Sequence, residues 1–407
     1  MIRILDWQDA KSLVARKTAR LDQAERVVAP ILADVRKRGD AALLDYARKF
    51  DGFARSSVRV QVAGSLAPDL QSAIETAARN IRQNAQRQLP RESMTEYPGG
   101  RRIGEIVRPM DSAGAYIPAG RFPLVSTLLM TVIPAQVAGV ENICVACPDP
   151  VPEIMGAAGW LGLKNLFQMG GAQAIAALAF GTETVPKVDC IVGPGNIYVA
   201  AAKKLIAGEI AIDFIAGPTE IVIIAAEGDP RWIAADMLAQ AEHDIDASSI
   251  LLTTSRALAE AVAAEIECQL TALPASEIAR KSIDNNGAIV IADSLGRAAD
   301  LSNALAPEHL SLHDPSLLGS IRHAGGVFLG PWSPEAAGDY ASGPNHVLPT
   351  SGAARRSGGL SAADFVKVIS VQELSPEGLA NLRPAITTLA RAEGLEAHAR
   401  SVEVRFA

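Results

Sequence analysis

The chain has 407 residues, more than a single hydrophobic core usually serves, so we expect two or three domains. Apolar residues make up 49% of the chain but aromatic residues only 4%, a balance typical of closely packed helices and buried parallel strands. With 38 Lys and Arg against 45 Asp and Glu, the net charge is −7 and no long basic run is present, which argues against a nucleic-acid partner.

The start of the chain and its cysteines indicate the compartment. The first twenty residues alternate charged and apolar side chains and lack the continuous apolar stretch of a signal peptide. The longest apolar run, residues 128–140, is interrupted by polar residues and is too short to cross a bilayer. Four cysteines are too few for a disulfide scaffold, and Cys144 and Cys147 lack the second pair that would complete a zinc site. We therefore expect a cytoplasmic protein without a membrane span, in which Cys144 and Cys147 are buried strand thiols.

The first part of the chain is predicted to be helical scaffold. Apolar residues recur at three- and four-residue spacing in residues 10–21, 24–38, 41–50 and 68–89. From Ile103 short β-rich runs separated by Gly and Pro alternate with helical stretches, which predicts parallel βαβ units. The predicted strands are residues 114–118, 142–146, 165–168, 189–192 and 220–225.

Two neighbouring units each place a glycine-rich turn between a strand and a helix. The turns are Gly170-Gly171 and Gly193-Pro194-Gly195-Asn196. Such turns bring backbone N–H groups to a helix N-terminus, where an anionic phosphate is stabilised. Neither turn matches G-x-G-x-x-G, so a tight strand-to-helix connection and a nucleotide site at the strand carboxyl ends are both open interpretations.

A second α/β section covers residues 220–329, with strands predicted at 249–253, 287–291 and 326–328. Residues 331–364 are rich in Gly, Pro, Ser and Asn and are predicted to form a long irregular loop, which in compact proteins is usually functional or disordered. Residues 375–400 are predicted to form a helical tail. The predicted fold class is therefore α/β, with two incomplete Rossmann-like parallel-sheet domains, a helical N-terminal region and a helical C-terminal tail.

A candidate metal site lies at the end of a predicted helix that Asp229 caps and Pro230 begins. Gln240 and His243 are three residues apart and therefore share one face of this helix. An imidazole and an amide oxygen can supply two ligands to one metal ion, although glutamine is an uncommon ligand. A metal site and a solvated helix end are equally compatible with this spacing.

Glu308 and His309 form a candidate acid–base pair. Both side chains can move protons near neutral pH if burial raises the pKa of the glutamate, but a surface Glu-His pair is the alternative. Asp339 and His346 lie in residues 338–350, a segment with too many turn formers for a helix, where a carboxylate could complete a metal site. His398 lies in the tail, remote in sequence from the other candidates.

The two remaining histidines, His313 and His323, have no supporting motif and are assigned to ordinary structure.

Seven motifs, in family order over nearly the whole chain, resemble those of the histidinol dehydrogenase family. They are Gly170-Gly-Ala-Gln-Ala, Gly193-Pro-Gly-Asn, Ala216-Gly-Pro-Thr-Glu, Leu238-Ala-Gln-Ala-Glu-His, Ala306-Pro-Glu-His-Leu, the segment from Gly338 to Thr350, and Glu393-Gly-Leu-Glu-Ala-His. One such string could arise by chance, but seven in order indicate common descent.

The resemblance implies a role for each matching residue. It implies zinc ligands at Gln240, His243, Asp339 and His398, and a catalytic pair formed by Glu308 and His309. It places Tyr116, Gln173 and Asn196 at an NAD site. It places Thr219, His346 and Glu393 at the substrate site, beside the metal ligands and Glu308.

The implied reaction is a zinc-requiring, NAD-dependent four-electron oxidation of L-histidinol through an aldehyde to L-histidine, the last step of histidine biosynthesis. The family forms intertwined homodimers in which the tail reaches the partner's active site, so His398 is expected to act across the interface. The implied domains are a helical region leading into the first α/β domain (1–115), an inserted NAD-binding domain (116–219), the rest of the first domain with the zinc and catalytic residues (220–364), and the tail (365–407).

Three departures from the family pattern bear on the substrate. Thr219 stands where the family usually has serine, which keeps the hydroxyl but narrows the pocket. Ala119 stands where the family usually has glycine, and an alanine there requires a negative φ. With Arg121 the chain resembles relatives of this family that oxidise other alcohols, including anionic ones. These residues leave open the alternative that the chain is a paralogue that oxidises another amino or sulfonated alcohol. A catalytically silent zinc-binding or scaffolding protein is a third alternative.

Overall fold

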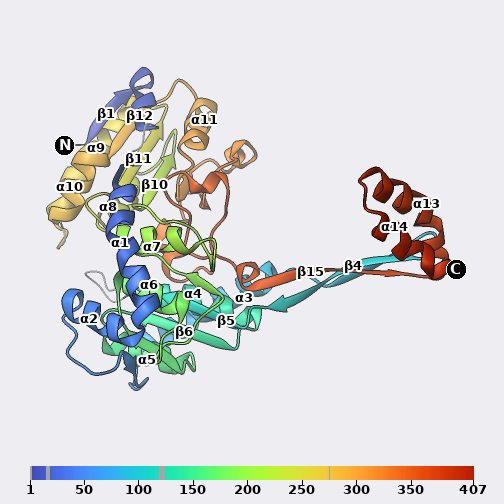
Figure 1. Ribbon diagram of the computed structural model, residues 1–407. Helices are drawn as coiled ribbons and strands as arrows, with labels where there is room; N and C mark the ends of the chain where they lie inside the picture. The colour runs from blue at the N-terminus through green and yellow to red at the C-terminus, as the bar shows by residue number, and fades with distance from the viewer. Residues whose placement is uncertain (1, 15–18, 119–123, 275) are drawn as a thin grey trace.

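The computed structural model of the protein describes residues 2–14, 19–118, 124–274 and 276–407. The chain forms two α/β lobes and a long arm that projects from them and ends in two helices (Figure 1). Among the described residues, none of the helices combines the length and the apolar character that a bilayer span requires.

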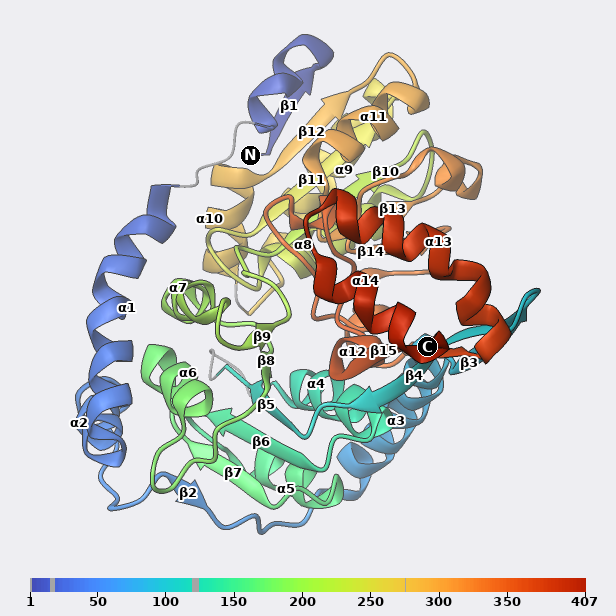
Figure 2. The ribbon, with the colours of Figure 1, turned by 45° about the vertical axis from the view of Figure 1, so that its right-hand side comes forward.

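The lower sheet in Figure 2 has six strands in the order β2-β7-β6-β5-β8-β9. Its strands pair in parallel, except that β2 runs antiparallel to β7. The strands are β2 (Arg59–Val60), β5 (Ser112–Tyr116), β6 (Asn142–Cys147), β7 (Asn165–Gln168), β8 (Cys190–Val192) and β9 (Ala211–Ile212). Because β5 is followed by β6 on one side and by β8 on the other, the strand order reverses between β5 and β8.

Both faces of the lower sheet are buried, which explains its continuous apolar strands. In β6, Cys144 and Ala146 pack in one core cluster with α1, α2, α6 and α7, whereas Ile143 and Val145 pack in the other with α3, α4 and α5. The helices are α1 (Ala19–Arg38), α2 (Asp40–Phe50), α3 (Pro68–Gln88), α4 (Val125–Ala138), α5 (Pro152–Trp160), α6 (Gly171–Phe180) and α7 (Ile197–Ile206).

The upper sheet is parallel throughout and repeats this design, in the order β1-β12-β11-β10-β13-β14. Its strands are β1 (Arg3–Asp6), β10 (Glu220–Ile224), β11 (Ser248–Thr253), β12 (Ala288–Ile291), β13 (His309–Leu312) and β14 (Gly326–Leu329). One face packs against α8 (Pro230–Ala241), α9 (Arg256–Leu270) and α10 (Ser276–Asn286), and the other against α11 (Leu295–Leu305) and the 3-10 helix η1 (Trp7–Leu13).

The arm is a three-stranded antiparallel sheet in the order β15-β4-β3. It consists of β3 (Ser93–Tyr97), β4 (Arg101–Pro109) and β15 (Val366–Leu374), and it carries α13 (Pro376–Ala392) and α14 (Glu396–Glu403) at its far end (Figure 1). The remaining helices are α12 (Glu335–Tyr340) and the 3-10 helices η2 (Pro315–Ser320), η3 (Ala353–Arg355), η4 (Ala362–Phe365) and η5 (Val404–Phe406).

The predicted α/β class, with two parallel sheets and a helical tail, is confirmed. Two local predictions are wrong. Residues 10–21 do not form one helix, since a 3-10 helix ends at Leu13 and α1 begins at Ala19. Asp339 lies in a helix, α12, because Glu335-Ala336-Ala337 are good helix formers that outweigh the turn formers after them.

The two lobes meet through residues 338–350. Asn345 Nδ2 donates to the carbonyl oxygen of Met130 in α4 (2.7 Å), and His346 Nε2 lies 3.3 Å from the hydroxyl of Thr127 in the same helix. Helix α4 follows β5, so these contacts lie near the carboxyl edge of the lower sheet. They join that edge to the segment that carries the candidate site of the upper lobe.

Candidate active site

The candidate acid–base pair lies where β10 and β13 begin side by side. Glu308 Oε2 accepts hydrogen bonds from the Thr219 hydroxyl (2.5 Å) and from the Glu220 N–H (2.9 Å). Glu308 is only 7% exposed and His309 only 3%, so the surface-pair interpretation is wrong. Burial raises the pKa of Glu308, although His309, Thr219 and the Glu220 N–H act in the opposite direction.

The His309 imidazole lies among carboxyl groups. Its Nδ1 is 3.2 Å from the carbonyl oxygen of Glu220, 3.6 Å from Glu308 Oε2 and 3.7 Å from Glu335 Oε1. Its Nε2 is 3.5 Å from Asp339 Oδ1. Burial by itself would lower the pKa of His309, but the carboxylates of Glu335, Glu308 and Asp339 raise it to about 10. The imidazole is therefore held in a strongly negative environment.

Helix α12 supplies two of these carboxyl groups, Glu335 and Asp339, from successive turns. Three side chains can each offer one ligand atom here: His309, Glu335 and Asp339. These atoms lie within 4.8 Å of one another, close enough to share a metal ion. Burial raises the pKa of Glu335 to about 8, opposed by His309 and reinforced by Asp339. Glu335 is not among the residues predicted from the sequence, although a glutamate one helical turn before Asp339 was a usable signal.

Gln240, in α8, and His243, just after the end of this helix, approach the same cluster. Gln240 is 0% exposed and its side-chain amide contacts both Thr219 and Glu335, so the solvated-helix-end alternative is wrong for this residue. His243 is exposed, and its Nδ1 lies 2.9 Å from the carbonyl oxygen of Ala239. A proton on Nδ1 leaves the lone pair of Nε2 available to a metal, which is the usual arrangement for a histidine ligand.

Asp339 contacts His346 through its backbone and interacts with the neighbouring histidines through its side chain. His346 Nδ1 lies 2.8 Å from the backbone carbonyl oxygen of Asp339, and burial lowers the pKa of His346. Burial opposes ionisation of the Asp339 side chain, but His309, His346 and His243 together lower its pKa. Asp339 is therefore the most stably ionised carboxylate of the group.

The residues of this cluster fit a divalent cation. Carboxylate and imidazole groups converge beside the Gln240 amide, and His309 Nε2 is buried without a hydrogen-bond partner among the described residues. Zinc takes imidazole and carboxylate ligands in proteins. A cation here would also neutralise part of the negative charge that raises the pKa of His309 and would favour ionised carboxylates.

The three candidate NAD-site residues lie near the carboxyl edge of the lower sheet. The Tyr116 hydroxyl, at the end of β5, accepts a hydrogen bond from the Gly171 N–H (3.1 Å), and Gln173 Nε2 donates to Asp51 Oδ2 (3.1 Å). Asn196 caps α7 by accepting from the N–H groups of two residues in its first turn. This edge includes the reversal of strand order between β5 and β8, where ligands of such sheets commonly bind.

The glycine-rich turns do not offer all their N–H groups to a ligand. Asp51 Oδ2 accepts from the Gly170 N–H (3.3 Å), so together with Tyr116 it occupies the start of α6. Asp51, at the end of α2, was placed in scaffold by the sequence pattern. Burial raises the pKa of this carboxyl group, while its hydrogen bonds from Gln173 and Gly170 lower it.

Glu393 and His398 are not brought to the cluster within one chain. Both are exposed, and they belong to the end of α13 and to α14, which stand at the far end of the arm (Figure 1). Ala119 and Arg121, on which the alternative substrates depended, lie outside the described residues.

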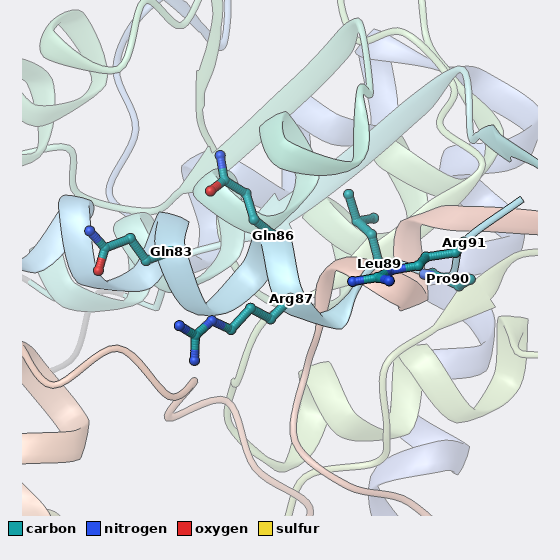
Figure 3. A pocket seen from close by; sticks show the side chains of 6 residues that line it. All are labelled: Gln83, Gln86, Arg87, Leu89, Pro90 and Arg91. Atoms are coloured by element: carbon teal, nitrogen blue, oxygen red, sulfur yellow. The ribbon is translucent and has the colours of Figure 1, made fainter.

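A separate cavity of about 460 Å³ lies at the C-terminal end of α3 (Figure 3). It is lined by Gln83, Gln86, Arg87, Leu89, Pro90 and Arg91. None of these residues belongs to the predicted site.

Comparisons with known proteins agree on one family. The family model described as histidinol dehydrogenase matches residues 14–406. Histidinol dehydrogenase from Halalkalibacterium halodurans is 48% identical, with 100% of this chain and 99% of the relative covered. The crystal structure of histidinol dehydrogenase from Elizabethkingia anophelis superposes with a TM-score of 0.94 at 38% identity, covering 100% of this chain and 98% of that one.

A more distant likeness concerns the fold alone. An acetylating aldehyde dehydrogenase from Geobacillus thermoglucosidasius superposes with a TM-score of 0.52 at 13% identity, over 90% of this chain and 94% of that one.

Proposed function

The chain belongs to the histidinol dehydrogenase family and is an oxidoreductase that acts on CH–OH groups. From this premise we propose that it oxidises L-histidinol to L-histidine in two NAD-dependent steps, through a bound aldehyde, with zinc held by Gln240, His243, Asp339 and a tail histidine. The observation that carries the proposal is the burial of Glu308 and His309 beside the Gln240, Glu335 and Asp339 side chains.

Zinc, when bound, would hold the imidazole and amino nitrogens of the substrate and so fix the carbinol carbon for reaction. NAD would accept one hydride in each step, and Tyr116, Gln173 and Asn196 are the residues proposed to hold it.

His309 is the proposed base for the alcohol proton. The substrate hydroxyl gives its proton to the imidazole as hydride leaves the carbinol carbon, which produces the aldehyde. Glu335 and Asp339 stabilise the imidazolium that forms, because their carboxyl oxygens lie 3.7 and 3.5 Å from its two nitrogens. The same base can then release the proton before the second oxidation.

Glu308 is the proposed base for water. The Thr219 hydroxyl and the Glu220 N–H orient its carboxylate, which takes a proton from the water that adds to the aldehyde carbon. Loss of a second hydride and a proton from the resulting hydrate gives the carboxylic acid, which releases a further proton to become the carboxylate product. A bound aldehyde is protected from escape to solvent.

The arm supports the proposed homodimer. Within one chain α13 and α14 stand away from the lobes, and arm side chains such as Val368 and Ile369 are 47% and 44% exposed. We propose that a second copy covers this surface and that Glu393 and His398 complete the partner's site. We also propose a cytoplasmic location, which three buried cysteines with raised pKa values suit.

Product stoichiometry tests the proposal. Purified protein supplied with zinc, NAD and L-histidinol should form two NADH for each L-histidine, and chelator treatment should stop the reaction until zinc is restored. A protein with confirmed bound zinc that forms no NADH from L-histidinol would contradict it. Thr219 keeps the hydroxyl contact to Glu308, so no described residue favours the alternative alcohols.

A further inference from the structure

The side chains of Gln240 and Glu335 lie in direct contact inside the site. A glutamine amide has two possible orientations, which place either its nitrogen or its oxygen against the neighbouring group. With the nitrogen against Glu335, it donates to Glu335 Oε1 (2.5 Å) and Oε2 (2.8 Å), and the amide oxygen lies on the side of the Thr219 hydroxyl. With the amide oxygen against Glu335, it would face the carboxylate oxygens, and all of these atoms are hydrogen-bond acceptors.

The orientation matters because only the amide oxygen of glutamine can ligate a metal. With a cation bound beside it, Glu335 would be ionised. An ionised carboxylate has acceptors and no donor, so it favours the orientation that turns the amide nitrogen toward it and the oxygen away. We propose that Glu335 is a positioning residue that fixes the Gln240 amide with its oxygen available to the cation. The inference rests on the proposed function, since it presupposes that Gln240 is a ligand.

The surroundings of Glu335 suit this role. It is 3% exposed, it is the first residue of α12, and Pro334 precedes it, so its backbone position is constrained. Asp339, a proposed ligand, lies one turn later on the same helix. Helix α12 therefore carries one ligand and the group that orients another, and a displacement of this helix would change both.

Direct ligation and simple charge attraction would also link Glu335 to metal binding. Its carboxylate could ligate the cation directly, since it lies within 4.8 Å of ligand atoms of His309 and Asp339. It could also attract the cation through charge alone. Asp236 provides a control for charge. It is half-buried one helical turn before Gln240 and raises the pKa of Glu335, but makes no hydrogen bond to Gln240 among the described residues.

Zinc affinity, measured by competition with a chromophoric chelator, provides the test. Glu335→Gln supplies both a donor and an acceptor at the same position and so no longer selects one amide orientation. We expect it to weaken zinc binding about 10–100-fold, as loss of an orienting partner of a metal ligand typically does. Asp236→Asn removes a nearby charge and should weaken it much less. Glu335→Asp keeps a carboxylate and should retain more affinity than the isosteric Gln.

A double-mutant cycle separates orientation from direct ligation. In a Gln240→Ala background, Glu335→Gln should have no further effect on zinc affinity, because no amide remains to be oriented. An undiminished effect in that background, or equal losses for Glu335→Gln and Asp236→Asn, would overturn the inference. If wild-type protein fails to bind zinc, the proposed function itself fails. Thermal unfolding of the metal-free variants, followed by circular dichroism, checks that each one folds.

Discussion

Burial decides the chemistry of Glu308 and His309. On a surface, a glutamate and a histidine in sequence would each titrate near their ordinary pKa values and exchange protons with water. Here the pKa of both groups is raised, by burial for Glu308 and by neighbouring carboxylates for His309. The pair is therefore set apart from solvent and from its usual protonation equilibria, as is common for catalytic groups.

Replacing His309 with Asn tests its assignment as a base. Asparagine keeps a polar side chain but cannot accept a proton near neutral pH, so kcat should fall about 10²–10⁴-fold. Zinc content should stay that of the wild type, because the proposed ligands are Gln240, His243 and Asp339 together with His398. Stopped-flow NADH formation and metal analysis measure the two quantities. An unchanged rate would contradict the role of base, and loss of zinc would instead make His309 a ligand.

Sequence motifs identified most residues of this cluster but not the contacts between them. Gln240, Glu308, His309 and Asp339 were all predicted, and the structure brings them together. Glu335 was not predicted, because residues 331–364 were expected to form a loop, in which a glutamate four residues before Asp339 need not lie beside it. Its importance follows only from its position, which depends on how α12 packs between α8 and β13.

At the level of elements, a buried ion pair holds the glycine-rich turn after β8. Lys203 in α7 pairs with Asp213, and both side chains are almost fully buried. Lys203 Nζ also donates to the Gly193 carbonyl oxygen (3.0 Å), while Asp213 Oδ2 accepts from the Gly193 N–H (2.7 Å). Gly193 has φ +110° and a Cβ there would meet the Tyr116 carbonyl oxygen at 2.2 Å, so glycine is required.

Breaking this pair should destabilise the lower lobe. Lys203→Met leaves the Asp213 carboxylate buried and without its partner, which typically costs about 3–5 kcal/mol of unfolding free energy. Adding Asp213→Asn removes the charge but keeps an acceptor for the Gly193 N–H, so it should recover part of that loss. Urea unfolding followed by circular dichroism measures both variants. A loss below about 1 kcal/mol for Lys203→Met would show that the pair contributes little.

Strands buried on both faces were predictable, whereas others were not. Residues 142–147 and 220–224 read as continuous apolar runs because helices cover both sides of them. β13 begins with His309 and includes Ser311, so its apolar run is too short to stand out. β4 and β15 pair with each other in the exposed arm, where no buried face imposes an apolar pattern. Their pairing joins residues more than 250 positions apart, which local patterns cannot indicate.

At the scale of the whole molecule, one chain separates residues that the proposed site needs together. The tail helices stand at the end of the arm (Figure 1). The carboxyl cluster lies on α12 and β13, and the segment that follows α12 contacts α4 of the lower lobe. A rigid β-sheet connects them, so the tail has no flexible linker with which to fold back onto its own lobes. A symmetric dimer resolves this separation, because each arm can then serve the site of the other chain.

Mixed dimers test whether His398 acts across the interface. Two copies carrying different affinity tags, one with His309→Asn and one with His398→Asn, can be coexpressed and the heterodimer purified. If the tail serves the partner, one of the two sites combines an intact His309 with an intact His398, and the heterodimer should show about half of wild-type activity. If each tail served its own chain, both sites would lack one histidine and the heterodimer would be as inactive as either parent homodimer. The inactivity of the two parents under the same assay is the control, and recovery of activity only in the heterodimer would assign His398 to the partner's site.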